Sequence, residues 1–441
     1  MKFETLKQSH LKRNIIIGAV AVLIISAVIL TFTRAKYRVT KSIPLVNGTI
    51  NYSLADLNVV ALYINGVEAE ELDSTKSYTL DTTQSTCTYK DGTTIDNLTL
   101  SYDSSSKAFS ISPYTTKGTK CTLYFDEYLP NAKDTILKNY PTILTRRDFS
   151  TTVTNTTTGT IYKSLDETQY DNDGEVYYFA GNPQDNWIYF AGYYWRIIRI
   201  NGDGTIRIIY SGTSTEATGT DVQIGTNTYN DTSTNNMYVG FMYTEGNVHG
   251  TGTSSAIKIK LDEWYNDNLT PHANNVDFDA GFCNDRTPST NSSNSNGEGG
   301  TGETLTYYGA YIRLVSNKTP NFTCSNNDLF TVNSSSKGNH ALQYPIGLLT
   351  ADEVVYAGGV NELSNTNYYL YTGSSYWTMT PHRYPGIGTS SEIFGIALNG
   401  NFGGDHAIVN LPLGIRPVIN LRANITISSG DGTSSNPYIV S

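Results

Sequence analysis

The sequence predicts an α+β fold in which one N-terminal transmembrane helix is followed by a small all-β, sandwich-like module and then by a larger domain with few helices and much loop. An uncharged apolar run near the N-terminus predicts the membrane helix. Apolar and polar residues alternate between turn residues over most of the remaining chain, which is the pattern of strands. In the C-terminal half, apolar residues at helical spacing predict one helix and a capping box predicts a second.

The apolar run at 15–32 spans about 27 Å at 1.5 Å per residue, close to the roughly 30 Å hydrocarbon core of a bilayer. Lys12 and Arg13 precede the run, and positive residues tend to stay in the cytoplasm. We therefore expect a cytoplasmic tail at residues 1–13, a single-pass signal anchor in the cell membrane at 14–33, and an extracellular C-terminal remainder. A cleaved signal peptide and a buried core helix are the alternatives.

The composition is that of an acidic chain with few charges. Charged residues make up 16% of the 441 residues, whereas about 25% is usual for a soluble domain. Thr, Ser, Asn and Gly, with 33 Tyr, replace them and suit half-buried sheet surfaces. The net charge is −10, and residues 1–38 hold seven basic residues against one acidic residue, so the rest of the chain is more acidic still. This balance excludes nucleic acid as a partner, because phosphate binding needs a basic surface.

Four cysteines, Cys87, Cys121, Cys283 and Cys324, allow three pairings. Sequential pairing, Cys87 with Cys121 and Cys283 with Cys324, keeps each bond within one predicted domain, so we expect these two disulfides. Each would stabilise its domain by roughly 3–4 kcal/mol in the chain-entropy model. Free buried thiols are one alternative. A zinc site is another, although the sequence lacks Cys or His pairs at the short spacing that zinc sites use.

Residues 39–128 predict the small all-β module. The stretches 98–102 and 108–112 alternate apolar and polar residues on either side of a turn, and the stretch 121–125 alternates again. Residues 129–159 follow as a linker, which contains a short helical pattern that ends before a proline.

Residues 160–441 form the larger domain. Strand patterns at 186–190, 194–200 and 205–210 surround an Asn-Gly-Asp-Gly turn, which predicts antiparallel neighbours in one sheet.

Two helices are expected in this domain. Residues 254–268 carry apolar side chains at helical spacing and predict a helix that packs on the sheet. The second helix is expected to begin at Thr350, because Thr350 and Glu353 fit a capping box. Residues 287–303 are rich in Ser, Asn and Gly, and they predict a surface loop.

One turn offers a metal candidate. Asp171, Asp173 and Glu175 are candidate ligands for Ca²⁺, which prefers carboxylate and carbonyl oxygens. The turn lacks the full EF-hand pattern, so a solvated turn before a strand is the alternative. No other cofactor is expected. Residues 297–302 fit the pattern G-x-G-x-x-G, but they neither follow a predicted strand nor begin a helix, so they do not predict a nucleotide site.

The segment around Trp377 offers a candidate binding site. We expect Trp377 in the core and Thr380, His382, Arg383 and Tyr384 along a ligand-binding loop, because Tyr, Arg and Trp are common on recognition surfaces. A plain loop is the alternative. The sequence has no nucleophile elbow, P-loop or zinc-protease motif, so we assign no catalytic residue.

Five motifs of the larger domain carry a family resemblance. They are GYYWRIIRINGDGTIR at 192–207, FCNDR at 282–286, IGLLTADE at 346–353, YWTMTP at 376–381 and GIRPVINL at 414–421. Together they resemble bacterial surface domains, found in gut Firmicutes and Mollicutes-like species, that are similar to the formylglycine-generating-enzyme and C-type-lectin-like fold. The match covers roughly residues 160–441, and the family has no settled function.

The resemblance implies a compact α+β domain with ligand-binding loops. Catalytic members of the wider fold hold copper with two cysteines near the C-terminal end, whereas the last cysteine here is Cys324. We therefore expect a non-catalytic cell-surface binding or adhesion protein, whose loops around 287–303 and 376–390 meet an extracellular glycan or protein. A cell-envelope enzyme on the same fold and a purely structural envelope component are the alternatives.

Overall fold

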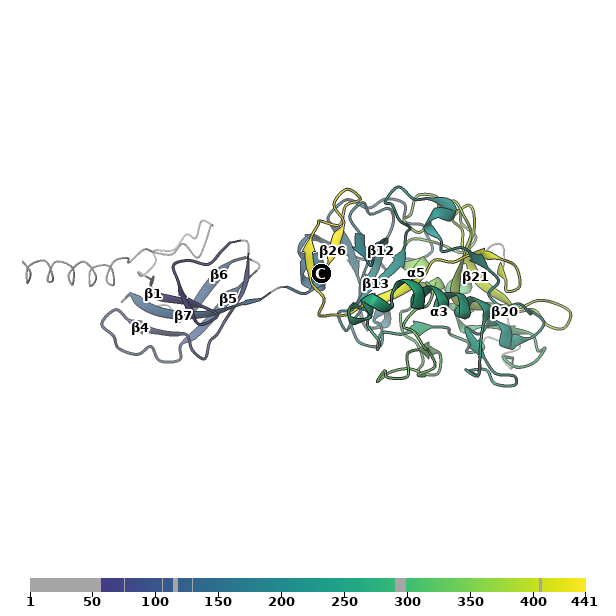
Figure 1. The fold of residues 1–441 in the computed structure, drawn as a ribbon, viewed down its shortest axis with the longest axis horizontal. Coiled ribbons are helices and arrows are strands. Elements are labelled where there is room, and N and C mark those ends of the chain that lie inside the picture. The colour runs from purple at the N-terminus through teal and green to yellow at the C-terminus, as the bar shows by residue number, and fades with distance from the viewer. Residues whose placement is uncertain are drawn as a thin grey trace, which may run out of the picture. The chain divides into compact units, whose positions relative to one another are not determined.

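The computed structural model describes residues 57–441, except 75, 105, 114–117, 129, 290–298 and 404–406. Contacts divide the chain into two compact units, residues 1–129 and 130–441, each of which can be followed in Figure 1. Strands account for 34% of the described residues and helices for 14%. The predicted α+β class is therefore wrong, because the fold is mostly β. The longest described helix has 13 residues, and most of the others are one or two turns long.

The predicted transmembrane helix at 14–33 lies outside the described residues. Within the described part of the chain, no helix has both the length and the apolar character needed to cross a bilayer.

The described part of the smaller unit is built from strands. They are β1 (Leu57–Ile64), β2 (Val67–Ala69), β3 (Ser77–Leu80), β4 (Thr86–Tyr89), β5 (Thr99–Asp103), β6 (Ala108–Ser112) and β7 (Thr119–Tyr128). Five of them form one sheet in the order β2-β1-β7-β3, in which β4 also pairs with β7 and β1 runs parallel to β7. The hairpin of β5 and β6 is separate, and it confirms the alternation at 98–102 and 108–112.

The sheet and the hairpin share one core. Leu62, Leu123 and Phe125 are buried on the sheet, and Leu100 of β5 joins the same cluster. Cys87 and Cys121 lie opposite each other on β4 and β7 and form a disulfide, as predicted.

The larger unit holds a nine-stranded sheet in the order β25-β26-β11-β12-β10-β9-β8, in which β13 lies between β12 and β24. Its strands are β8 (Thr142–Thr145), β9 (Thr160–Lys163), β10 (Tyr177–Tyr178), β11 (Trp187–Phe190), β12 (Tyr193–Ile200), β13 (Ile206–Tyr210), β24 (Val418–Leu421), β25 (Ile427–Ser429) and β26 (Tyr438–Val440). The predicted pairing of 194–200 with 205–210 is confirmed. Strands β13 and β24 are buried along their whole length, including Arg207 and Asn420 between their apolar residues.

A second sheet of the larger unit has six strands, in the order β14-β23-β20-β21-β22 with β18 also paired to β20. Its strands are β14 (Thr226–Asn227), β18 (Thr306–Tyr307), β20 (Tyr376–Tyr384), β21 (Glu392–Ile396), β22 (Ala407–Ile408) and β23 (Leu413–Gly414). Two further pairs are β15 (Met242–Tyr243) with β16 (Thr253–Ser254), and β17 (Phe282–Cys283) with β19 (Leu329–Phe330). In the view of Figure 1, β12, β13 and β26 lie toward one end of this unit, and β20 and β21 lie toward the other.

The helices of the larger unit are short. The α-helices are α2 (Ala132–Lys138), α3 (Ala256–Asn268), α4 (Gly309–Tyr311) and α5 (Ala351–Tyr356), and the tighter or wider turns are η1 (Glu167–Gln169), η2 (Gly219–Val222), η3 (Asn236–Val239), η4 (Thr270–Asn275) and η5 (Ile312–Ser316). The helix predicted at 254–268 is confirmed as α3. The predicted capping box is present at α5, where Thr350 and Glu353 satisfy each other's backbone donors.

Residues 130–159, which the sequence predicts as a linker, belong to the larger unit. Ala132 and Ile136 of α2, with Tyr140 and Phe149, are buried in its core. Strand β8 pairs in parallel with β9. The structure confirms the helical pattern as α2, whereas strand β8 was not predicted.

Candidate functional site

The candidate site is a small polar cavity in the larger unit, named the disulfide cavity after the bond between Cys283 and Cys324 that lines it. It lies where the turn 171–173, the segment 279–283 that ends in β17, the segment 321–324 and the start of α5 meet. Its free space is about 60 Å³. Pockets for whole small molecules are about 300–1,000 Å³, so this cavity admits a few water molecules or one polar head group. Four of the five motifs that carry the family resemblance contribute lining residues.

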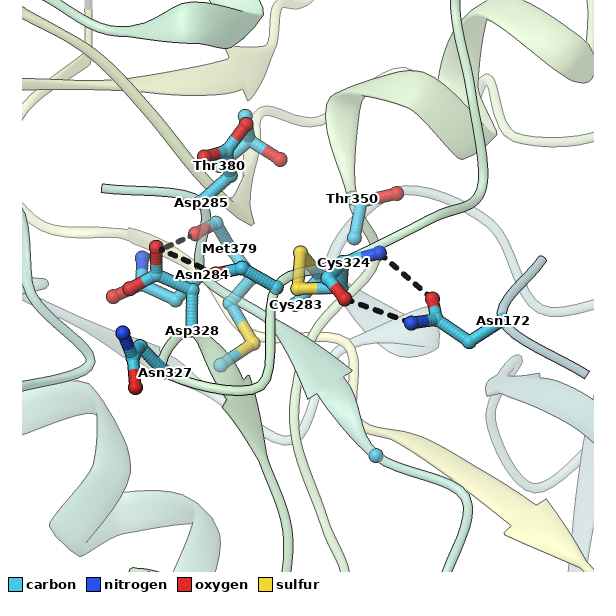
Figure 2. The surroundings of a disulfide bond; sticks show 12 residues. Asn172, Cys283, Asn284, Asp285, Cys324, Asn327, Asp328, Thr350, Met379 and Thr380 are labelled. Carbon is cyan, nitrogen blue, oxygen red and sulfur yellow. Dashed lines mark hydrogen bonds between the residues drawn. A yellow bond between two sulfur atoms is a disulfide. The ribbon is translucent and has the colours of Figure 1, made fainter. Parts of the chain in front are cut away.

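The disulfide between Cys283 and Cys324 forms one wall of the cavity. This pairing confirms the second predicted bond. Figure 2 shows the side-chain amide of Asn172 against the backbone of Cys324: its Nδ2 donates to the carbonyl oxygen at 2.9 Å, and its Oδ1 accepts from the N–H at 2.8 Å. The turn 171–173 and the segment 321–324 are therefore held together by both hydrogen bonds and sulfur.

A buried ion-pair network forms the floor. Glu353 of α5 is 1% exposed and lies 2.5 Å from Arg207 Nε and 3.0 Å from Arg199 Nε. Arg199 also pairs with Asp171 at 3.1 Å, and Arg207 donates further hydrogen bonds to backbone carbonyls. A buried carboxylate is tolerated when cations and hydrogen bonds compensate its lost hydration, and here two guanidinium groups and the Thr350 N–H do so.

A second arginine cluster lies beside the first. Arg313 donates through Nε and Nη2 to the two oxygens of Asp352, both at 2.8 Å, and through Nη1 to Asp285 at 3.2 Å. The bidentate geometry is the strong form of this pair. Burial lowers the pKa of Arg313, but the two carboxylates outweigh burial and raise it. All three arginines of the cavity are thus already bound to acids.

The lysine of the cavity lies between carboxylates. The Lys337 ammonium is 2.7 Å from Asp173 Oδ1 and 3.5 Å from Asp203 Oδ2. Burial lowers the pKa of Lys337, but its hydrogen bonds and charge interactions with Asp173 and Asp203 outweigh burial and raise it. Asp279 accepts hydrogen bonds from the Ser336 N–H and the Ser335 hydroxyl, which lower its pKa and hold the lysine's loop in place.

One lining residue retains a buried acceptor without a partner. Asn201 is 5% exposed, and its Nδ2 donates to Thr205 Oγ1 and Asn420 Oδ1. Its Oδ1 has no hydrogen-bond partner in the described part of the chain. A buried carbonyl oxygen of this kind favours a donor in the adjoining space.

No protein-family model, curated protein sequence or solved structure matches the chain. The resemblance to the formylglycine-generating-enzyme and C-type-lectin-like fold therefore stays a prediction.

The three calcium candidates each face a cation of the protein. Asp171 accepts hydrogen bonds from backbone N–H groups of its own turn and pairs with Arg199. Asp173 pairs with Lys337, and Glu175 pairs with Lys163 at 2.9 Å. Among the described residues no group of three or more His, Cys, Asp or Glu side chains is arranged to hold a metal ion.

The four predicted ligand-binding residues lie on strand β20 and not on a loop. Thr380, His382 and Tyr384 are buried, His382 to 1% exposure, and Arg383 is partly exposed. His382 Nδ1 lies 3.0 Å from Glu392 Oε2 of the neighbouring strand β21, and Arg383 Nε lies 2.8 Å from the same oxygen. Thr380 alone of the four lines the cavity. Trp377 is fully buried, as expected for a core residue.

Acidification is expected to destabilise the larger unit through Glu353. Burial raises the pKa of Glu353, but the charges of Arg207 and Arg199 outweigh burial and hold it below its usual 4.5. Its contribution to stability is therefore complete above pH 4.5 and is lost as the pH falls through the lower folded-state value. Urea unfolding followed by tryptophan fluorescence between pH 7 and pH 3 measures this loss, because all four tryptophans lie in the larger unit.

The matched variant is Glu353→Gln, which removes the titrating group. Its stability should fall less steeply over the same acidic range than that of the wild-type chain. Equal slopes for the two proteins would contradict the assignment to Glu353.

Proposed function

We propose that this chain is an extracellular, non-catalytic binding protein at the cell surface, and that the disulfide cavity holds a lysine ammonium of a basic protein ligand. The observation that carries the proposal is the charge of the lining: six aspartates face three arginines and one lysine. The two disulfides support an extracellular location, because such bonds persist in oxidising environments.

The arginines are not free to bind an anionic ligand, since each already binds one or more carboxylates. The aspartates at the rim are also paired, Asp173 and Asp203 with Lys337 and Asp285 with Arg313, but each keeps part of its carboxylate exposed. The position of the Lys337 ammonium is direct support for the choice of ligand, because a ligand ammonium can take the same place when Lys337 moves out.

The size of the cavity and the charge of the chain agree with this ligand. A cavity of about 60 Å³ takes a head group and leaves the rest of the ligand outside. A net charge of −10 attracts basic partners and speeds their encounter at low salt. The unpartnered Asn201 Oδ1 favours a ligand that donates hydrogen bonds.

The test compares a lysine-rich peptide with the same peptide acetylated on its lysines, titrated against the purified full chain by calorimetry. Acetylation removes the charge, so we expect at least tenfold weaker binding, about 1.4 kcal/mol. The double variant Asp173→Asn with Asp203→Asn should lose binding to the same extent. Lys337→Gln should gain affinity, because it removes the internal competitor.

The control is Asp221→Asn, an exposed carboxylate on η2 that does not line the cavity and should leave binding unchanged. Equal affinity for the two peptides, or weaker binding by Lys337→Gln, would count against the proposal. So would a complete lack of binding by the folded chain.

A further inference from the structure

The Lys337 ammonium shows which shape of cation the disulfide cavity accepts. Asp173 Oδ1 lies 2.7 Å and Asp203 Oδ2 lies 3.5 Å from the same nitrogen, and the two carboxylates come from different turns. Carboxylates that converge on one nitrogen suit a compact point charge. A guanidinium is planar and pairs best with both oxygens of one carboxylate, as Arg313 does with Asp352 in the same cavity.

Both carboxylates keep this arrangement without help from Lys337. Asp203 Oδ1 accepts hydrogen bonds from the N–H and the hydroxyl of Thr205, at 3.0 and 2.6 Å, so the other oxygen faces the ammonium. The turn that carries Asp173 is closed by a hydrogen bond from its N–H to Asp171 Oδ1 at 2.9 Å. The Lys337 side chain is 32% exposed, so it can turn into solvent while the carboxylates stay in place.

The cavity holds a third acceptor, which Lys337 does not use. Asn201 lines the cavity and is 5% exposed, and its Oδ1 accepts no hydrogen bond from any described residue. A primary ammonium brings three N–H donors. These match the oxygens of Asp173, Asp203 and Asn201 in number. Each methyl group on the nitrogen removes one donor and leaves one of these acceptors unpaired, which opposes binding.

The cavity also lacks what a methylated ammonium needs. Such cations are bound by the faces of several aromatic rings. Phe322 is the one aromatic side chain among the described residues that line the cavity. Its ring is 4.7 Å from the guanidinium carbon of Arg199 and stacks on Tyr356 at 3.8 Å between centroids. The free space of about 60 Å³ is walled by a disulfide, so three methyl groups find neither an aromatic partner nor room.

We infer that the disulfide cavity selects unmethylated lysine and rejects both methyllysine and arginine. The inference rests on the proposed function and narrows its ligand, because charge alone does not distinguish these three side chains. Methylation keeps the charge of a lysine. Methylation of the ligand would therefore abolish recognition without changing the long-range attraction between the ligand and this acidic chain.

The experiment titrates the purified full chain by calorimetry with three versions of one lysine-rich peptide. Its lysines are unmodified, trimethylated, or replaced by arginine, and at pH 7 all three versions carry the same charge. We expect trimethylation and the arginine replacement each to weaken binding about tenfold or more, because N–H donors are lost in the first and the geometry is wrong in the second. A monomethylated peptide should bind with intermediate affinity.

The variant Asn201→Ala tests the third acceptor. It should weaken binding of the unmodified peptide and leave binding of the trimethylated peptide unchanged, so the ratio of the two affinities falls. Asp221→Asn, away from the cavity, should keep the wild-type ratio. Far-ultraviolet circular dichroism shows whether Asn201→Ala is folded, and the peptide series on the wild-type chain decides the inference if it is not. An unchanged ratio in the folded variant would contradict the role of Asn201.

The acetylated peptide separates this inference from the proposed function. If the trimethylated or the arginine peptide binds as tightly as the unmodified peptide while the acetylated peptide binds weakly, the inference is overturned and the proposed function stands. If the acetylated peptide binds as tightly as the unmodified one, or if no peptide binds, the proposed function fails and the inference fails with it.

Discussion

Glu353→Gln is expected to lower the free energy of unfolding of the larger unit by about 3–5 kcal/mol at pH 7. The substitution keeps the shape of the side chain and an oxygen that accepts from the Thr350 N–H, so the helix cap survives. It removes the charge that compensates the buried guanidinium of Arg207, which is 1% exposed, and that of Arg199. Urea unfolding followed by tryptophan fluorescence reports this unit alone.

Two further proteins make this result interpretable. Glu263→Gln breaks an exposed pair with Lys260 on α3, and exposed pairs are worth about 0.2–1 kcal/mol, so its effect should be small. Arg207→Met combined with Glu353→Met replaces both charges by apolar groups and should be less destabilising than Glu353→Gln alone. If Glu353→Gln is as stable as Glu263→Gln, the network does not stabilise the fold.

Replacing Cys283 and Cys324 together by alanine is expected to lower the free energy of unfolding of the larger unit by about 4 kcal/mol. The two cysteines are 41 residues apart, and the chain-entropy model gives this magnitude for a loop of that length. Because the bond is also a wall of the candidate site, binding of the lysine-rich peptide should weaken in the same variant.

The matched variant replaces Cys87 and Cys121, which are 34 residues apart in the smaller unit. The expected loss is again about 4 kcal/mol, now in the smaller unit. That unit has tyrosines but no tryptophan, so its unfolding is followed by tyrosine fluorescence. The tryptophan signal of the larger unit is quenched or subtracted. Thiol labelling of the native wild-type chain should find no free cysteine. Labelling of all four would contradict both disulfides.

Local patterns in the sequence predicted individual elements better than the fold class. The alternation at 194–210, the helix at 256–268 and the capping box at Thr350 are decided by residues close together in the chain, and each is present. The prediction of an α+β class gave too much weight to such helices. Their local patterns do not show how small a share of the chain is helical compared with the strands. The strand β8 was missed because its four residues are all exposed and show no alternation.

The candidate site was harder to predict, because it depends on residues that are far apart in the chain. The sequence identified Glu353 as a helix cap but gave no sign that Arg199 and Arg207, about 150 residues earlier, meet its carboxylate. The aspartate turn was correctly seen as rich in oxygen ligands, yet Arg199 and Lys337 hold the positions in which a calcium ion was expected. The polar and aromatic residues at 380–384 were interpreted as a loop. They lie on β20, which is buried although it carries many polar side chains.

The larger unit begins and ends at one place. Asn131 bridges to Thr426, and Ser441 donates its N–H to the carbonyl of the same threonine. Neighbouring strands lie about 5 Å apart, so the two ends of this unit are separated by roughly two strand spacings. Tension applied between them would load the few hydrogen bonds at this junction first, and the disulfide cavity is built from other segments.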